Sequence, residues 1–93
     1  MSDLEAFPGG DLVAKGLADL RAGRESVESL LVLQAESRLR ELGLDVPDAG
    51  VVDPDWKMYR LIERELGDGA HSRYNALRRQ LASFMRAFTC ASR

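Results

Sequence analysis

The chain has 93 residues, enough for one domain with one core, because a protein of this length buries roughly 60 % of the surface that its unfolded form exposes. Its formal net charge of −2 argues against general affinity for nucleic acid, since phosphate binding usually requires a basic domain or patch. No apolar run approaches the roughly 20 residues of a membrane-spanning helix, so we expect no membrane partner.

The single cysteine, Cys90, cannot form an internal disulfide. The N-terminus lacks the basic start and apolar centre of a signal peptide, so we expect a reduced, cytoplasmic protein. Eleven of the thirteen basic residues are arginines. We associate that excess with GC-rich bacterial genomes and expect a bacterial protein.

Residues 1–10 include a Phe-Pro-Gly-Gly run of helix breakers and turn formers, which predicts an irregular lead-in. A helix near 11–22 follows, with Asp11 placed to accept a hydrogen bond from an unpaired N–H of its first turn. Gly16 lies on the apolar face of this helix and weakens it relative to alanine. We therefore expect a neighbouring helix to approach the backbone closely at Gly16.

A second helix is predicted near 26–42, with Ser26 as its N-cap and Gly43 in the left-handed position after its end. Its apolar residues do not fall on one stripe. The helix is therefore either buried on two sides or bent near Gln34, and the sequence leaves both alternatives open. The proline, glycine and aspartates of residues 45–52 then indicate a surface connection.

The pair Asp53-Pro54 is a start signal for a third helix near 54–66, because aspartate is a favourable N-cap and proline suits the first helical position. Apolar residues cover much of the circumference of this helix, whereas a helix in a monomeric bundle normally keeps a polar half exposed. We therefore expect a symmetric homodimer with contacts from Trp56, Met58 and Leu61.

The last helix, near 70–90, has the clearest pattern, because its apolar side chains recur at steps of three and four and form one apolar seam. The seam consists of Ala70, Tyr74, Leu77, Leu81, Phe84, Met85 and Phe88. The four helical segments together predict an all-α fold, a small single-domain bundle of four or five helices with short connections, over residues 11–93.

Arginines on the outer face of the last helix are the best functional signal in the sequence. Arg73, Arg79 and Arg86 are candidate contacts to phosphate or to an acidic partner, although solvated arginines are common on an outer helix face. A helix-turn-helix arrangement fits poorly, because Glu63 occupies a position where a small residue usually lets the two helices approach.

His71 lies in a turn where several polar residue types cluster, and histidine is the side chain that most often acts as a general base. His71 and Cys90 are about 28 Å apart along a continuous helix, so they cannot form a catalytic pair within one chain. They also supply no metal-ligand spacing. We expect no metal, no cofactor and no catalytic residue.

The expected function is that of a non-catalytic helical interaction module that self-associates and has an unidentified protein partner. One alternative is a nucleic-acid-associated or regulatory protein that uses the arginine face of the last helix. That alternative requires Arg73, Arg79 and Arg86 on one uncovered surface and predicts steep weakening with salt. Another is small-molecule binding or catalysis at the His71 turn, which requires a pocket beside His71.

Overall fold

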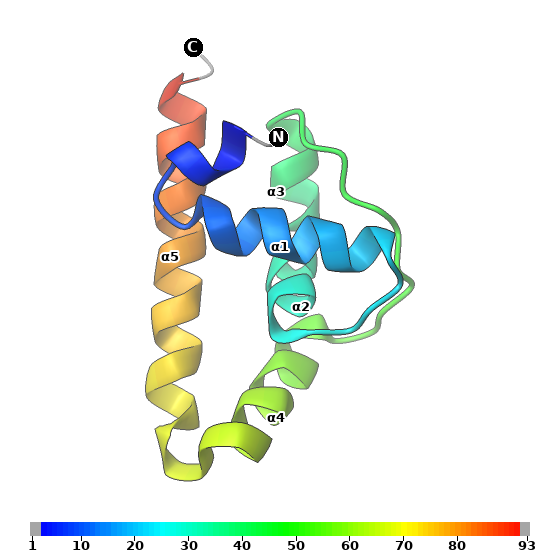
Figure 1. The fold of residues 1–93 in the computed structure, drawn as a ribbon, viewed down its shortest axis with the longest axis vertical. Helices are drawn as coiled ribbons and strands as arrows, with labels where there is room; N and C mark the ends of the chain where they lie inside the picture. The colour runs from blue at the N-terminus through cyan, green and yellow to red at the C-terminus, as the bar shows by residue number, and fades with distance from the viewer. Residues whose placement is uncertain (1–2, 92–93) are drawn as a thin grey trace.

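Five α-helices and two short 3₁₀ helices surround one core in the computed structural model, which describes residues 3–91 (Figure 1). The elements in chain order are η1 (Asp3–Ala6), α1 (Gly10–Arg21), α2 (Val27–Gln34), α3 (Glu36–Glu41), α4 (Pro54–Leu66), η2 (Gly67–Gly69) and α5 (Ala70–Ala91). The predicted all-α bundle is confirmed. Residues 1, 2, 92 and 93, which the sequence placed in the lead-in and at the domain end, lie outside the described part.

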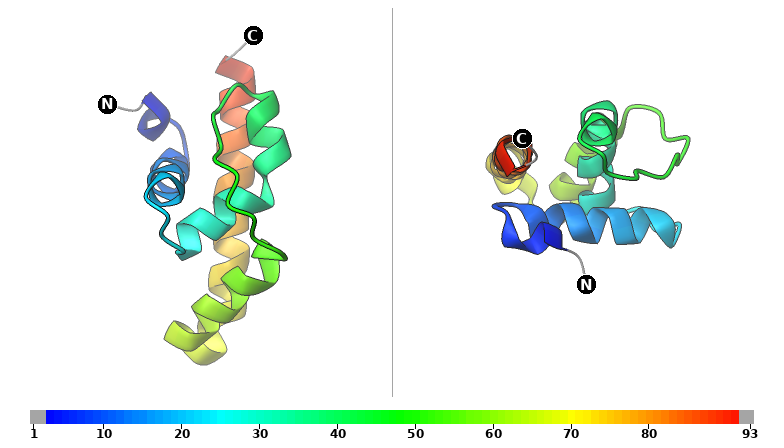
Figure 2. Two further views of the ribbon diagram at one scale, coloured as in Figure 1. Left: turned by 90° about the vertical axis from the view of Figure 1, so that its right-hand side faces the viewer. Right: turned by 90° about the horizontal axis from the view of Figure 1, so that it is seen from above.

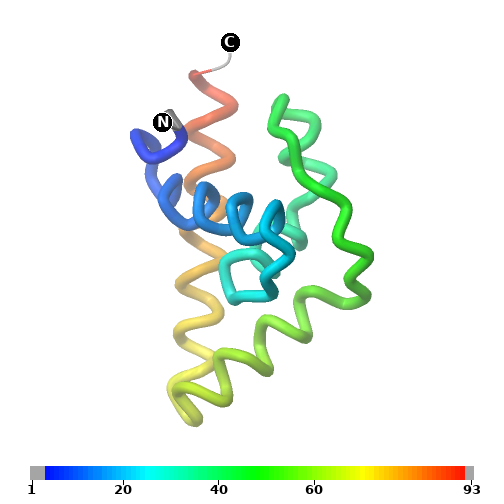
Figure 3. The backbone as a smooth tube through the Cα atoms, turned by 45° about the vertical axis from the view of Figure 1, so that its right-hand side comes forward, coloured from blue at the N-terminus to red at the C-terminus, as the bar shows by residue number. Residues whose placement is uncertain are grey.

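The helices do not all run side by side. α1 lies across α2 and α5, while α4 and α5 form a V that is joined at η2 (Figures 1 and 3). The connection between α3 and α4 runs along the outside of the molecule (Figure 2). Val46 anchors this connection, because its side chain is buried in the core and its carbonyl accepts hydrogen bonds from Arg40 Nη2 at 2.8 Å and Nε at 3.3 Å.

The apolar seam of α5 is largely buried as predicted, with Leu77, Leu81 and Phe84 in the core. Phe7 of the N-terminal segment covers the upper part of the seam. Its ring centroid lies 6.0 Å from that of Phe84, edge to face, and 5.3 Å from that of Phe88. The prediction of an irregular lead-in was wrong in part, because a 3₁₀ helix occupies Asp3–Ala6.

The start of α1 also differs from the prediction. Gly9 is the N-cap residue, in a left-handed conformation with a φ of 72°, while Asp11 lies within the helix and is exposed. A side chain at Gly9 would place its Cβ 2.5 Å from the carbonyl oxygen of Gln80 in α5. The close contact with α5 and the left-handed backbone together require glycine at this position, which the sequence alone did not reveal.

The predicted close approach at Gly16 is confirmed. A Cβ added there would lie 2.5 Å from the carbonyl oxygen of Glu28 and 2.5 Å from a methyl group of Val32. The absence of a side chain at Gly16 therefore lets α1 cross directly over the backbone of α2.

The turn between α1 and α2 brings Arg24 back to Asp19. Gly23 has a φ of 74°, and the Arg24 N–H donates to the Asp19 carbonyl at 2.8 Å, which is the hydrogen bond of a Schellman motif. The buried Asp19 carboxylate accepts hydrogen bonds from Lys15 Nζ at 2.8 Å, from Arg24 Nη2 at 2.9 Å and from Ser26 Oγ at 2.6 Å. These hydrogen bonds hold the pKa of Asp19 well below its usual range, and the bond from Lys15 has the largest effect.

Ser26 is the N-cap of α2, as predicted, and its Oγ accepts a hydrogen bond from the Ser29 N–H at 3.1 Å. The predicted second helix is interrupted at Ala35, which has a φ of −110° and a ψ of 23°. Both alternatives hold, because the helix is interrupted next to Gln34 and α2 itself is buried on more than one side, with the consecutive residues Leu30, Leu31 and Val32 all fully buried. The predicted end is confirmed, because Gly43 has a φ of 94° and the Leu44 N–H donates to the Leu39 carbonyl at 3.0 Å.

Candidate docking surface

One face of α4 packs against the rest of the chain. Met58 is fully buried and Ile62 is nearly so, and both belong to the core. The Tyr59 ring packs against the ring of Tyr74 in α5 at a centroid distance of 5.3 Å. The Tyr74 hydroxyl also donates a hydrogen bond to Asp55. These contacts turn the opposite face of α4 toward solvent.

The burial of Met58 corrects one of the three predicted dimer contacts. Its side chain is enclosed by its own chain, with the amide nitrogen of Gln34 3.2 Å from its sulfur. Leu61 is half-buried against the core, and only Trp56 is fully available on the surface. The prediction failed at Met58 because helical spacing identifies apolar residues but does not show how many of them neighbouring helices cover.

Large apolar side chains that remain exposed gather at α4. Within residues 3–91 they are Val52, Trp56 and Leu66, with exposed fractions of 73 %, 63 % and 51 %. Val52 lies just before α4, Trp56 in its first turn and Leu66 at its end. Single exposed apolar residues are common, but their concentration at one element of a small protein indicates an interaction surface.

Three cations share the outer face of α4 with Trp56. Trp56, Arg60 and Arg64 follow one another at steps of four, and Lys57 adjoins them, so the four residues form what we call the basic-aromatic stripe. The Arg60 guanidinium lies 5.2 Å from the centroid of the Trp56 ring, and its Nε is 3.9 Å from a Glu63 carboxylate oxygen. Lys57 and Arg64 form no ion pair with any residue between 3 and 91.

Sequence reasoning gave no role to Lys57, Arg60 or Arg64, although their spacing was visible. Aspartate and glutamate residues alternate with them along α4, and three acidic residues balance the three cations, so the segment has no net charge. The stripe becomes evident only when the buried face of α4 is known.

Two hollows adjoin along the side of α4 that faces the start of α2. The first, of about 290 Å³, is bounded by the basic-aromatic stripe, Leu61 and Glu25. The second, of about 340 Å³, shares Leu61 and Glu25, and we call the two together the α4 groove. The remaining residues that line the second hollow are Ser26, Val27, Glu28, Ile62, Glu65, Leu66, Arg73 and Leu77.

The arginines of α5 that the sequence singled out are exposed but do not share one surface. Arg73 borders the second hollow of the α4 groove. Arg79 borders a different hollow, beside Pro8 and Gly9, and Arg86 lies two turns further along α5. Arg73 is therefore separated from Arg79 and Arg86. Phosphate binding by the three arginines would require all of them on one surface.

His71 and Cys90 are both exposed and lie at opposite ends of α5. The His71 Nε2 is 3.2 Å from the side-chain nitrogen of Asn75, one turn later. His71 lines none of the hollows described here. Within residues 3–91, no three histidine, cysteine or acidic side chains are grouped so that they could hold a metal ion.

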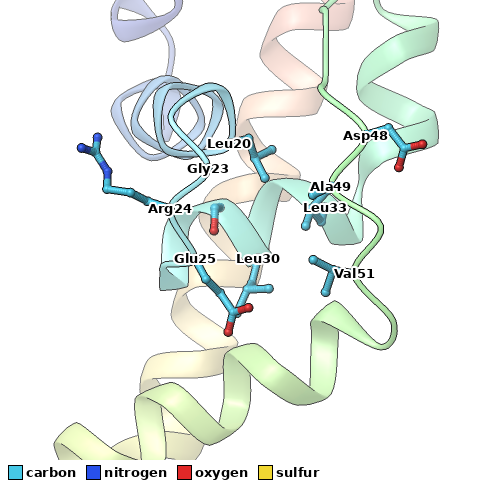
Figure 4. Close-up of a pocket in the computed structure, with 10 residues that line it drawn as sticks. Leu20, Gly23, Arg24, Glu25, Leu30, Leu33, Asp48, Ala49 and Val51 are labelled. Atoms are coloured by element: carbon cyan, nitrogen blue, oxygen red, sulfur yellow. The ribbon is translucent and has the colours of Figure 1, made fainter.

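A further cleft, of about 310 Å³, opens between the end of α1, α2 and the α3–α4 connection (Figure 4). Its walls are mostly apolar and include Leu20, Leu30, Leu33, Ala49 and Val51. Arg24 and Asp48 are directed away from the opening in Figure 4, and Arg24 is already bound to Asp19. Ligand sites usually combine apolar walls with a few convergent polar groups, so the α4 groove is the stronger candidate.

No protein-family model, curated protein or solved structure matches this chain. None of the helices within residues 3–91 combines the length and the hydrophobicity that crossing a membrane requires.

Proposed function

We propose that this protein is a helical interaction module without a catalytic role, which docks a protein partner on the exposed side of α4. The observation that carries the proposal is the concentration of exposed apolar side chains at α4, namely Val52, Trp56 and Leu66. Tryptophan and arginine are also the residues that most often contribute strongly to binding at protein interfaces. The basic-aromatic stripe presents both residue types on one helix that is fixed to the core by its opposite face.

The partner is either a second copy of this chain or another protein. Self-association is supported by Trp56 and Leu61, which remain available for a contact between copies after Met58 is assigned to the core. Closed two-fold dimers are the commonest assemblies of soluble proteins, and such a pair would bring two α4 helices together.

Site-specific photo-cross-linking tests the proposed surface and captures the partner whatever its identity. A photoreactive phenylalanine analogue replaces Val52 or Trp56 in the full chain, which is expressed in its native cells and irradiated. We expect a covalent adduct at both positions. An adduct with twice the 10.3 kDa mass of the chain identifies a second copy, and any other adduct is identified by mass spectrometry.

The matched control carries the same analogue at Arg79, which is also exposed but lies on α5 beside a different hollow. We expect little or no adduct from this position. Equal adduct yields at the three positions, or an adduct at Arg79 alone, would contradict the assignment of the docking surface to α4.

A further inference from the structure

We infer that the α4 groove binds a peptide segment of a partner protein in which a cluster of acidic residues adjoins a cluster of apolar residues. This inference rests on the proposed function and adds the chemistry of the partner. It follows from the two hollows of the groove, which adjoin at Leu61 and Glu25 but differ in their linings.

The first hollow suits carboxylates. Lys57, Arg60 and Arg64 border it, and Lys57 and Arg64 have no ion-pair partner among the described residues. An arginine guanidinium can bind a carboxylate through two parallel hydrogen bonds, which makes the pairing directional as well as charge-dependent. Glu25 supplies the single opposing charge in this hollow.

The second hollow suits apolar side chains. Ile62 and Leu77 form buried parts of its wall, Val27 is half-buried, and Leu66 is half-exposed at its edge. Because Ile62 and Leu77 are already buried, a partner removes apolar surface from water chiefly at Val27 and Leu66, and such removal is the principal favourable contribution in most protein association. Contact between this hollow and an apolar residue of a partner therefore favours binding.

The charges of the second hollow determine which end of the groove takes the acidic residues. Glu25, Glu28 and Glu65 border it, against the single cation Arg73; Glu28 is already paired with Lys15 at 3.5 Å, so Glu25 and Glu65 supply most of the repulsion. A carboxylate placed there would be repelled, whereas the same carboxylate beside Lys57 and Arg64 would be attracted. Acidic residues of the partner therefore lie at the Trp56 end of α4 and apolar residues at the Leu66 end.

The length of the groove is that of a short peptide. The helical rise places Trp56 and Leu66 about 15 Å apart along α4, which about five residues of an extended chain would span. A nucleic acid fits this surface less well, because its phosphates carry the same charge along the whole strand and would meet the glutamates of the second hollow.

The test uses a capped synthetic peptide, Glu-Glu-Asp-Glu-Leu-Phe-Leu-Leu, labelled with fluorescein and titrated with the full chain. Fluorescence anisotropy measures its affinity. The chain has one tryptophan, so a change in Trp56 emission reports binding at the stripe. We expect a peptide of the same composition with alternating residues, Glu-Leu-Glu-Phe-Asp-Leu-Glu-Leu, to bind at least about threefold more weakly, because in either chain direction it places carboxylates in the second hollow.

Charge reversal tests the residues. The double variant Lys57→Glu with Arg64→Glu should weaken binding of the peptide by about tenfold or more, since two attractive pairs become repulsive. The matched control, Arg79→Glu with Arg86→Glu, makes the same change in net charge on α5 and should alter the affinity by less than about twofold. If the first variant does not fold by circular dichroism, Lys57→Gln with Arg64→Gln replaces it, and a loss of affinity is again expected.

Three outcomes would overturn the inference: no binding of the peptide, equal effects of the two double variants, or tighter binding of an oligothymidylate than of the peptide. A fourth is self-association of the chain through α4 without peptide binding, which would identify a second copy as the occupant. Cross-linking at Val52 or Trp56 can still succeed in each case, so a failure here is distinguishable from failure of the proposed function.

Discussion

Asp19 joins three segments of the chain through one buried carboxylate. Lys15 belongs to the same helix, Arg24 to the turn, and Ser26 caps α2. Burial of a carboxyl group raises its pKa, but here the hydrogen bonds from Lys15, Ser26 and Arg24 outweigh that effect and lower the pKa of Asp19. The charged form of Asp19 is therefore the form that stabilises the folded protein.

We expect Asp19→Asn to lower the free energy of unfolding, because its amide NH2 group would then face the cationic group of either Lys15 or Arg24, and the negative charge that both bind would be lost. The folded-state pKa of Asp19 lies below the value of about 3.9 for an unfolded chain, so its stabilising contribution is complete above that pH. The contribution is lost as the pH falls through the folded-state pKa. Urea unfolding at about pH 7 and about pH 3 should show a smaller difference between the two proteins at the lower pH.

Asp45→Asn is the control for this variant, because Asp45 is exposed in the α3–α4 connection. It should change the free energy of unfolding by less than about 0.5 kcal/mol. Equal losses in the two variants, or a loss in Asp19→Asn that does not depend on pH, would show that the Asp19 contacts contribute little.

At the scale of elements, the crossing of α1 over α2 depends on Gly16. In an isolated helix, replacement of glycine by alanine is favourable by about 1 kcal/mol. Here the added Cβ would lie 2.5 Å from the Glu28 carbonyl oxygen, and the two helices would have to separate. We expect Gly16→Ala to reduce the free energy of unfolding by about 1–3 kcal/mol, the usual effect of overpacking, as measured by urea unfolding.

Gly69→Ala is the matched control, since the nearest atom to its added Cβ is that of Leu66 at an ordinary 3.7 Å, and its φ is not positive. This variant should be neutral or slightly stabilising. A Gly16→Ala protein as stable as the parent would mean that α1 and α2 have more freedom to separate than their contact indicates.

Burial of α2 on more than one side and the interruption at Ala35 together explain why the apolar residues of the predicted second helix do not fall on one stripe. α2 and α3 each have their own buried face, with Leu30 and Leu31 in α2 and Leu39 in α3. The sequence offered a bend near Gln34 as one of two alternatives. It could not identify the residue, because alanine is the strongest helix former and the break at Ala35 has no local signal.

For the whole molecule, the sequence predicted elements better than contacts between them. Helical periodicity was sufficient to place Leu77, Leu81 and Phe84 on the buried face of α5. The packing of Phe7 on that face could not be predicted, because it joins residues at opposite ends of the chain. Trp56 and Leu61 of the proposed docking surface were predicted as contacts, but its cations were missed for a related reason, since the exposure of Arg64 depends on which face of α4 the other helices cover.

Within residues 3–91, Phe84 is the largest fully buried side chain, and its replacement tests the core. We expect Phe84→Ala to cost about 3–5 kcal/mol, because its contacts with Phe7 and Phe88 are lost and a cavity remains. That is a large part of the roughly 5–10 kcal/mol expected for a domain of this size. Urea unfolding measures the loss directly.

The control is Val52→Ala, which shortens an apolar side chain that is 73 % exposed and should change stability by less than about 0.5 kcal/mol. A loss below about 1 kcal/mol for Phe84→Ala would mean that the seam of α5 is not the centre of the core.

The contact of Phe7 with Phe84 and Phe88 also has a consequence for how the protein is made. A ribosome synthesises the chain from its N-terminal end, so Phe7 emerges long before the part of α5 that it covers. During that interval the nascent chain exposes Phe7, α1 and α2 without their partner, and the core of the bundle closes only when α5 has left the ribosome. Folding of this bundle therefore waits for the synthesis of α5, which follows the other helices along the chain.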